Sequence, residues 1–265
     1  MIIPSIDILD GKVVQLKQGK TLEYTDQRSA PELAAYYGRF GEVAVVDLNA
    51  ALGSGENRDL IKECCKVARC RVGGGIRTEQ AVRDWIKAGA AKVVIGTKAS
   101  PEFLSQFPRE WIVAAVDAKG DEVMVEGWQQ GSGIGLIEKA KSLASHCSEF
   151  LFTQVDKEGM LGGSALEQAK LLHAAVDVPI TLAGGISTNE EVAEVVASEM
   201  NAQLGMALYK GQIDLVESWL ACLDWSKGDL LPTVVQDANT KDVLMVAFSN
   251  SDSVRNALTS GEGWY

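Results

Sequence analysis

The sequence predicts a (β/α)8 TIM barrel made of two similar half-barrels, followed by a short incomplete C-terminal appendage. Short apolar runs rich in β-branched residues alternate with longer stretches of helical period, which is typical of repeated βα units around a parallel sheet. Eight such pairs fit into about 223 residues, the length of a small barrel. The two halves of this region also resemble each other at a constant offset. An open doubly wound sheet is the alternative architecture.

The eight expected strands are short and begin at the N-terminus. They are Ile2–Ile8, Val43–Leu48, Arg71–Val72, Lys92–Ile95, Trp111–Val116, Phe150–Val155, Pro179–Ala183 and Ala202–Leu204. Helical patterns between them include Thr78–Ala88, Ile134–Ser145 and Ser164–His173, and an eighth helix is expected at Ile213–Leu223. This order predicts a barrel domain over residues 1–224.

The composition indicates a globular protein and disfavours nucleic-acid-binding and membrane-spanning proteins. Of 265 residues, 46% are hydrophobic and 23% are charged, which is the balance of a globular protein with one substantial core. The net charge of −11 disfavours nucleic acid and anionic membranes as partners. No segment approaches the roughly 18 unbroken apolar residues of a membrane span, and the N-terminus lacks the features of a signal peptide. The five cysteines have no histidine at metal-ligand spacing. We therefore expect a cytoplasmic protein with reduced thiols and no metal, and a monomeric barrel.

The internal repeat has an offset of 110 residues. It places Asp7 on Asp117 and the pair Gly74-Gly75 on Gly184-Gly185. With one residue of slip, Gly96-Thr97-Lys98 falls on Gly205-Met206-Ala207. Self-similarity across several motifs predicts two half-barrels of four βα units each.

Two aspartates stand where apolar strands end. Asp7 closes IIPSID and Asp117 closes WIVAAVD. Active sites of (β/α)8 barrels lie at the C-terminal ends of the strands, and the repeat assigns these residues to the first and fifth strands, on opposite sides of the barrel mouth. Such a pair suits one group taking a proton while the other gives one. We expect a catalytic acid–base pair, with loop or helix capping as the structural alternative.

Twin glycine clusters follow the third and seventh strands. VGGGIRT and LAGGIST let the backbone approach a ligand closely and leave N–H groups free, and IGTKA and GMALYKG supply the next loops. The expected phosphate-binding residues are Gly74, Gly75, Gly96, Thr97, Gly184, Gly185, Gly205 and Met206. Because the motif occurs twice, half a barrel apart, we expect a small substrate with a phosphate at each end. A tight βα loop without a ligand is the simpler alternative.

Further substrate contacts are expected around these motifs. Arg77 replaces its repeat mate Ser187 and adds a cation to one end of the site. Thr153 closes the sixth strand, and Trp128 lies in the loop after the fifth strand, where it could stack on a planar ring. Asp47 borders the second loop, and loop capping is an equally good explanation for it. Neither histidine of the chain is expected to be catalytic.

The motifs PSIDILDGKVVQL, VVDLNAALGSGEN, VGGGIRT, VDAKGDEVMVEGW, FTQVDKEGMLGG and LAGGIST together resemble the histidine-biosynthesis isomerase family, phosphoribosylformimino-5-aminoimidazole carboxamide ribotide isomerase. The resemblance covers about Met1 to Leu223. It implies an Amadori rearrangement of an aminoaldose to an aminoketose, without cofactor or metal. Asp7 would then remove the C2 proton, Asp117 would assist ring opening, and Thr153 and Trp128 would contact the substrate.

The chain departs from the family pattern at two places. Glu158-Gly159 stands where Asp-Gly is common, and Gln154 stands where an acidic residue is frequent; these departures concern fine substrate positioning more than the reaction itself. The related cyclase of imidazole glycerol phosphate synthase typically reads Cys-Leu-Asp at Ser5-Ile6-Asp7 and lacks the Gly-Trp loop, so it ranks second. The same motifs would also suit a bifunctional isomerase that accepts phosphoribosyl anthranilate as well, or a non-enzymatic phosphate-binding barrel.

The character of the chain changes beyond Asp224. Residues 225–265 start a new strand–turn–strand–helix pattern, with a hairpin turn expected at NTKD. The segment from about Leu230 resembles the N-terminal part of phosphoribosyl-AMP cyclohydrolase, without that family's metal-binding cysteines and histidines. We therefore expect a linker and a truncated cyclohydrolase-like segment without activity of its own.

Overall fold

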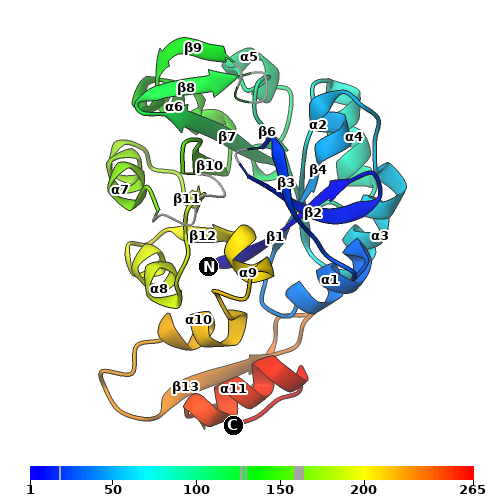
Figure 1. Ribbon diagram of the computed structural model, residues 1–265. Coiled ribbons are helices and arrows are strands. Elements are labelled where there is room, and N and C mark those ends of the chain that lie inside the picture. Colours follow the sequence, from blue (N-terminus) through cyan, green and yellow to red (C-terminus); the bar gives the residue numbers. More distant parts are fainter. Residues whose placement is uncertain (18, 126–127, 129, 158–163) are drawn as a thin grey trace.

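A closed barrel of parallel strands dominates the structure (Figure 1). The computed structural model describes residues 1–17, 19–125, 128, 130–157 and 164–265. Within these residues each barrel strand pairs in parallel with the next, and the pairing of Ile112–Lys119 (β7) with Glu149–Gln154 (β10) completes the ring. This closure confirms the predicted (β/α)8 barrel and excludes the open sheet.

The barrel strands and the outer helices alternate along the chain. The other six barrel strands are Ile2–Leu9 (β1), Val43–Asp47 (β4), Cys70–Gly73 (β5), Lys92–Ile95 (β6), Ile180–Ala183 (β11) and Asn201–Leu204 (β12). The α-helices around them are Ala30–Tyr37 (α1), Leu48–Leu52 (α2), Arg58–Val67 (α3), Glu79–Lys87 (α4), Pro101–Leu104 (α5), Leu136–Leu143 (α6), Leu166–Ala175 (α7), Asn189–Ala197 (α8), Met206–Tyr209 (α9) and Leu215–Ala221 (α10). Two short 3-10 helices lie at Arg109–Trp111 and Ala144–His146.

Two β-hairpins extend the sheet at positions where the sequence analysis assigned no strand. Lys12–Lys17 (β2) and Thr21–Thr25 (β3) follow the first barrel strand, and Glu122–Val125 (β8) and Gln130–Gly135 (β9) follow the fifth. The expected helix at Ile134–Ser145 therefore begins later, at Leu136, because Ile134 and Gly135 belong to β9. The hairpins stand half a barrel apart, as two similar half-barrels require.

The repeat is visible in backbone detail. Gly74 and Gly75 have φ angles of 97° and 66°, and their repeat mates Gly184 and Gly185 have 86° and 79°. This left-handed region is open to glycine and costly for other residues. Thr78 caps α4 by accepting a hydrogen bond from the backbone N–H three residues later, and its repeat mate Thr188 caps α8 in the same way.

A buried ionic layer fills the barrel below the strand ends. Arg71 is 0% exposed, and its guanidinium donates to Glu149 Oε1 at 2.6 Å and Oε2 at 3.0 Å and to Glu42. Lys92 Nζ donates to Glu149 Oε2 at 2.9 Å. Burial alone would raise the pKa of Glu149, but the neighbouring Arg71 outweighs it and the pKa falls to about 2. Paired in this way, the charges are tolerated in the interior.

Residues after the barrel form a small separate sheet. Leu231–Gln236 (β13) and Val243–Ser249 (β14) pair antiparallel, and Ser251–Ser260 (α11) follows. The turn between the strands contains the NTKD segment, as expected. Arg255 of α11 forms an ion pair with Glu217 of α10, and Figure 1 shows α11 near α10. Within the described residues, no helix is both long and apolar enough to cross a lipid bilayer.

Candidate active site

One cavity opens at the C-terminal ends of the barrel strands, and it collects nearly all of the predicted site residues. Its lining includes both aspartates, Thr153, Trp128 and Arg77. All eight expected phosphate-binding residues also line it, namely Gly74, Gly75, Gly96, Thr97, Gly184, Gly185, Gly205 and Met206. Asp47 is absent from the described lining. The barrel geometry therefore brings together motifs that lie up to about 200 residues apart.

Asp7 projects from β1 into this cavity. Ser5 Oγ donates to Asp7 Oδ1 at 3.0 Å, and Gln15 Nε2 of β2 reaches Asp7 Oδ2 at 3.4 Å. Burial raises the pKa of Asp7 to about 6, against the opposing effect of the Ser5 hydrogen bond. A carboxylate with a pKa near 6 is mostly ionised at neutral pH and is basic enough to take a proton.

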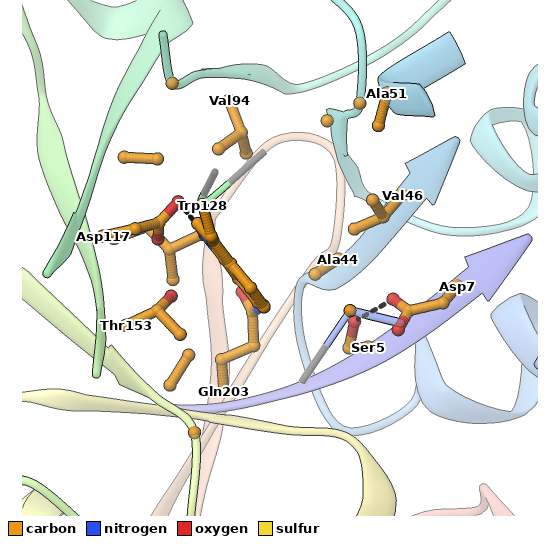
Figure 2. A pocket seen from close by; sticks show the side chains of 18 of the residues that line it. Ser5, Asp7, Ala44, Val46, Ala51, Val94, Asp117, Trp128, Thr153 and Gln203 are labelled. Atoms are coloured by element: carbon orange, nitrogen blue, oxygen red, sulfur yellow. Dashed lines mark hydrogen bonds between the residues drawn. The ribbon is translucent and has the colours of Figure 1, made fainter. Parts of the chain in front are cut away.

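Asp117 projects from β7 on the other side of the cavity. Trp128 Nε1 donates to Asp117 Oδ2 at 2.9 Å, and Thr153 is its register partner on β10. Burial raises the pKa of Asp117, while hydrogen bonds from Trp128 and Thr153 oppose the rise. Figure 2 shows the two aspartates on opposite sides of the pocket, with the Trp128 indole between them in this view. Neither aspartate caps any of the described helices.

Trp128 lies inside the cavity mouth. Its φ of 68° is unusual for a large side chain, and its indole donates to Asp117 within the cavity. A Cβ added to Gly19 would lie 3.1 Å from the Trp128 ring, so the backbone of Gly19, shortly before β3, packs against the indole. The hairpins after the first and fifth strands thus meet over the cavity.

The first glycine loop is tightly packed as well as exposed to the cavity. A Cβ on Gly74 would lie 2.2 Å from the Asp47 carbonyl oxygen, and one on Gly75 would lie 2.3 Å from the Ala50 carbonyl oxygen. Close packing therefore accounts for part of the glycine requirement, in agreement with the tight-loop interpretation. The same residues still border the cavity, so a phosphate can approach their backbone.

The two ends of the cavity differ in charge. Arg77, Lys98 and Lys139 border it beside the first pair of glycine loops. Arg77 donates to the carbonyl oxygens of Ala50 and Ala51, and Lys139 Nζ donates to the Ala99 carbonyl at 2.6 Å. The described lining residues between 183 and 207 include no lysine or arginine.

A carboxylate, Glu191, binds the loop after the second glycine pair, but neither Glu191 nor its partner Ser187 is part of the described cavity lining. Glu191 Oε2 accepts from the backbone N–H of Ser187 at 2.7 Å and from its hydroxyl at 3.0 Å. The two ends of the cavity were expected to differ in charge because of Arg77. Lys98 and Lys139 add to this difference.

The geometry of Asp47 favours the loop-capping interpretation. Asp47 is 1% exposed. Its Oδ1 accepts from the backbone N–H of Ala50 at 3.1 Å and from Asn57 Nδ2 at 2.8 Å, and its Oδ2 accepts from the Asn57 backbone N–H at 2.7 Å. All of these partners belong to the loop and helix that follow β4. The strand-end position alone did not distinguish this role from substrate binding.

Sequence reasoning missed six polar residues of the described lining. They are Ser5, Gln15, Arg71, Lys98, Lys139 and Gln203. Lys98 had a detectable signal, because its repeat mate is Ala207 and the substitution breaks the symmetry as Arg77 does. Ser5 precedes Asp7 by two residues, so strand alternation would have placed it on the same face. Glu158 and Gly159, where the chain departs from the family pattern, lie outside the described residues.

Comparisons with known proteins point to one family. A family model described as histidine biosynthesis protein matches residues 1–214. A protein of Methanocaldococcus jannaschii is 36% identical over 227 residues, which cover 81% of this chain and 96% of that protein. A protein of Methanoregula boonei is 36% identical over 231 residues, with 82% and 97% covered, and one of Methylococcus capsulatus is 32% identical over 236 residues, with 82% and 96% covered. All three are named 1-(5-phosphoribosyl)-5-((5-phosphoribosylamino)methylideneamino) imidazole-4-carboxamide isomerase.

Proposed function

We propose that this chain, which belongs to the histidine biosynthesis protein family, is an intramolecular aldose–ketose isomerase that acts on phosphoribosylformimino-5-aminoimidazole carboxamide ribotide. The observation that carries the proposal is the pair of carboxylates with raised pKa values on opposite sides of one cavity. The substrate named for the relatives has two phosphoribosyl groups. Its two phosphates suit a cavity that has a pair of glycine loops at each end.

The reaction needs one acid and one base. In an Amadori rearrangement, Asp117 in its protonated form gives a proton to the ring oxygen of the aminoaldose as the C1–O bond breaks and the amine nitrogen forms a C=N bond with C1. Asp7 then takes the C2 proton, and the electron pair of that C–H bond forms a C1=C2 enaminol. Return of a proton to C1 and loss of the proton from the C2 hydroxyl give the aminoketose, so the product is an isomer of the substrate.

The environments of the two aspartates support these roles. With a pKa of about 6, Asp7 is mostly ionised above neutral pH, as a base must be. Burial favours the neutral form of Asp117. A neutral carboxylic acid can keep accepting from the Trp128 N–H through one oxygen while the other oxygen donates its proton.

The remaining contacts follow from the lining. At the first end, Gly96 and Thr97 lie beside Lys98 and Lys139, so a phosphate there meets both backbone and cations. At the second end, the loops at Gly184-Gly185 and Gly205-Met206 offer backbone N–H groups without a neighbouring cation among the described lining. We propose a small bisphosphorylated substrate as the partner of this site, in a monomeric barrel in the cytoplasm, where its free cysteines stay reduced.

A spectroscopic isomerase assay on the purified protein tests the proposal. Wild-type protein should turn over the ribotide, and Asp7→Asn and Asp117→Asn should each lower kcat by at least about 100-fold while substrate still binds. Near-wild-type turnover by either variant would remove that residue from the acid–base pair. A parallel assay with phosphoribosyl anthranilate measures whether the isomerase accepts a second substrate.

For residues 225–265 we propose no activity of their own. This segment contains neither cysteine nor histidine, and none of its residues lines the cavity. Cyclohydrolase turnover of phosphoribosyl-AMP measured with added zinc should stay at background. Measurable turnover that depends on zinc would overturn this part of the proposal.

A further inference from the structure

A serine precedes one of the two aspartates, whereas an alanine precedes the other. Ser5 lies two residues before Asp7 on β1, and the 110-residue offset gives it Ala115 as its repeat mate, two residues before Asp117 on β7. Alternate residues of a strand share a face, and both positions line the cavity. A methyl group is therefore enough to build the barrel strand at this position, so the hydroxyl is a feature of the Asp7 side alone.

The Ser5 hydroxyl is bound to the Asp7 carboxylate. Ser5 is 6% exposed, and its Oγ donates to Asp7 Oδ1 at 3.0 Å, as the dashed line in Figure 2 shows. The other oxygen, Oδ2, accepts from Gln15 Nε2 at 3.4 Å. The longer bond is the weaker one. Oδ1 is thus the anchored oxygen of Asp7, and Oδ2 is the oxygen that a ligand can engage more easily.

The backbone of Ser5 is held from two sides. Tyr209 Oη of α9 donates to the Ser5 carbonyl oxygen at 2.9 Å, and Ser5 pairs in register with Ala44 of β4. Tyr209 is itself buried, and burial raises its pKa well above the ordinary value, so its hydroxyl remains protonated and can keep donating. Ser5 therefore presents its hydroxyl to Asp7 from a fixed strand.

Among the described residues, no lysine or arginine pairs with Asp7. Its register partners on the neighbouring strands are valines, Val14 on β2 and Val46 on β4. The titratable side chain that senses its charge is Tyr209, which is neutral. Burial raises the pKa of Asp7, and the Ser5 hydrogen bond opposes this rise. Loss of the Ser5 hydroxyl should therefore act directly on the ionisation of Asp7.

We propose that Ser5 is a positioning residue that fixes the Asp7 carboxylate and favours its ionised form, so that Oδ2 takes the C2 proton of the sugar. This inference rests on the proposed isomerase function. A hydrogen bond to the charged form of an acid stabilises that form. Because the bond occupies Oδ1, the lone pairs of Oδ2 stay available to the substrate.

The pH dependence of kcat/KM tests this role. Ser5→Ala should move the acidic midpoint of the profile from about 6 to about 7, because the pKa of Asp7 rises further without its donor. The plateau value of kcat above pH 8 should fall about three- to tenfold with KM changed less than about threefold, because the carboxylate is no longer held in place. Ser5→Thr keeps a hydroxyl on Cβ and should keep the midpoint within about 0.3 pH units of the wild type.

Ser148→Ala is the matched control. Ser148 is half-buried, its Oγ donates to the Ile112 carbonyl oxygen at 3.0 Å, and it is not part of the described cavity lining. This variant should keep the wild-type midpoint and a kcat within about twofold. A double variant adds Ser5→Ala to Asp7→Asn. It should change the remaining turnover of Asp7→Asn less than about twofold, because Ser5 acts through the Asp7 carboxylate.

Several results would overturn the inference. These are an unmoved midpoint in Ser5→Ala, an equal shift in Ser5→Thr or Ser148→Ala, or a further loss of more than about twofold when Ser5→Ala is added to Asp7→Asn. Inactive wild-type protein would instead refute the proposed function. Active wild type with an unmoved midpoint in Ser5→Ala would refute the role of Ser5 alone, so the two failures are distinguishable.

Discussion

Replacing Asp7 with asparagine should make the protein more stable at pH 8 while it removes activity. Burial raises the pKa of Asp7 from 3.8 to about 6 in the folded protein, so the native state resists ionisation of this group. A carboxyl group with a raised native pKa adds stability that is complete below pH 3.8 and is lost as the pH rises through about 6. At pH 8 the wild type has therefore lost this contribution, and the neutral asparagine has not.

The shift sets the size of the effect. About two pKa units correspond to about 3 kcal/mol, and this is an upper bound because Asp7 is only half-buried and water in the open cavity screens its charge. For a chain of this size, such a difference raises Tm by about 5 to 10 °C. Thermal unfolding of Asp7→Asn and wild type at pH 8 and pH 4.5 measures it, with Asp229→Asn in the exposed linker as a control that leaves Tm unchanged.

The pH dependence decides whether this reasoning is correct. The advantage of Asp7→Asn should shrink between pH 6 and pH 4 and nearly vanish near pH 4, where the wild-type carboxyl is also neutral. A Tm equal to or below that of the wild type at pH 8 would refute the burial argument. So would an advantage of the same size at both pH values, because it would have a cause other than ionisation.

Three further predictions concern catalysis, the ionic layer and the glycine loops. The kcat/KM of the wild type should fall about tenfold per pH unit below pH 6, as the base Asp7 becomes protonated; a flat profile from pH 7 to pH 4.5 would contradict its role. Arg71→Met should lower the free energy of unfolding by about 3–5 kcal/mol in denaturant titrations, because two buried carboxylates lose the fully buried guanidinium that pairs with both of them; an unchanged midpoint would contradict this. Gly96→Ala should keep the wild-type Tm, since the new Cβ meets only Ala115 at 3.9 Å, but raise KM about tenfold by crowding a phosphate. Gly74→Ala should lower Tm strongly, because the new Cβ would clash with the backbone of Asp47. Equal Tm values for the two alanine variants would contradict the close packing of the first glycine loop.

Much of the fold could be predicted from the sequence because its signals are local or repeated. Each barrel strand is a short apolar run, and each appears within a few residues of its expected position. The offset between Asp7 and Asp117 predicted their placement on β1 and β7, since symmetry relates positions without knowledge of contacts. The hairpins β2–β3 and β8–β9 were missed, because their pairing depends on extension of a sheet that local patterns do not reveal.

The sequence by itself determined the barrel, its half-barrel repeat and the two aspartates at the strand ends, since periodicity and spacing are properties of the chain alone. Only the tertiary structure decided which polar groups already have partners. Asp47 is occupied by its own loop, whereas the Oε1 of Gln203 is buried without a partner among the described residues, although both side chains are polar and lie at or near a strand end. Hydrogen-bond satisfaction and burial depend on neighbours that are far apart in the chain, and these two quantities also set the pKa of Asp7.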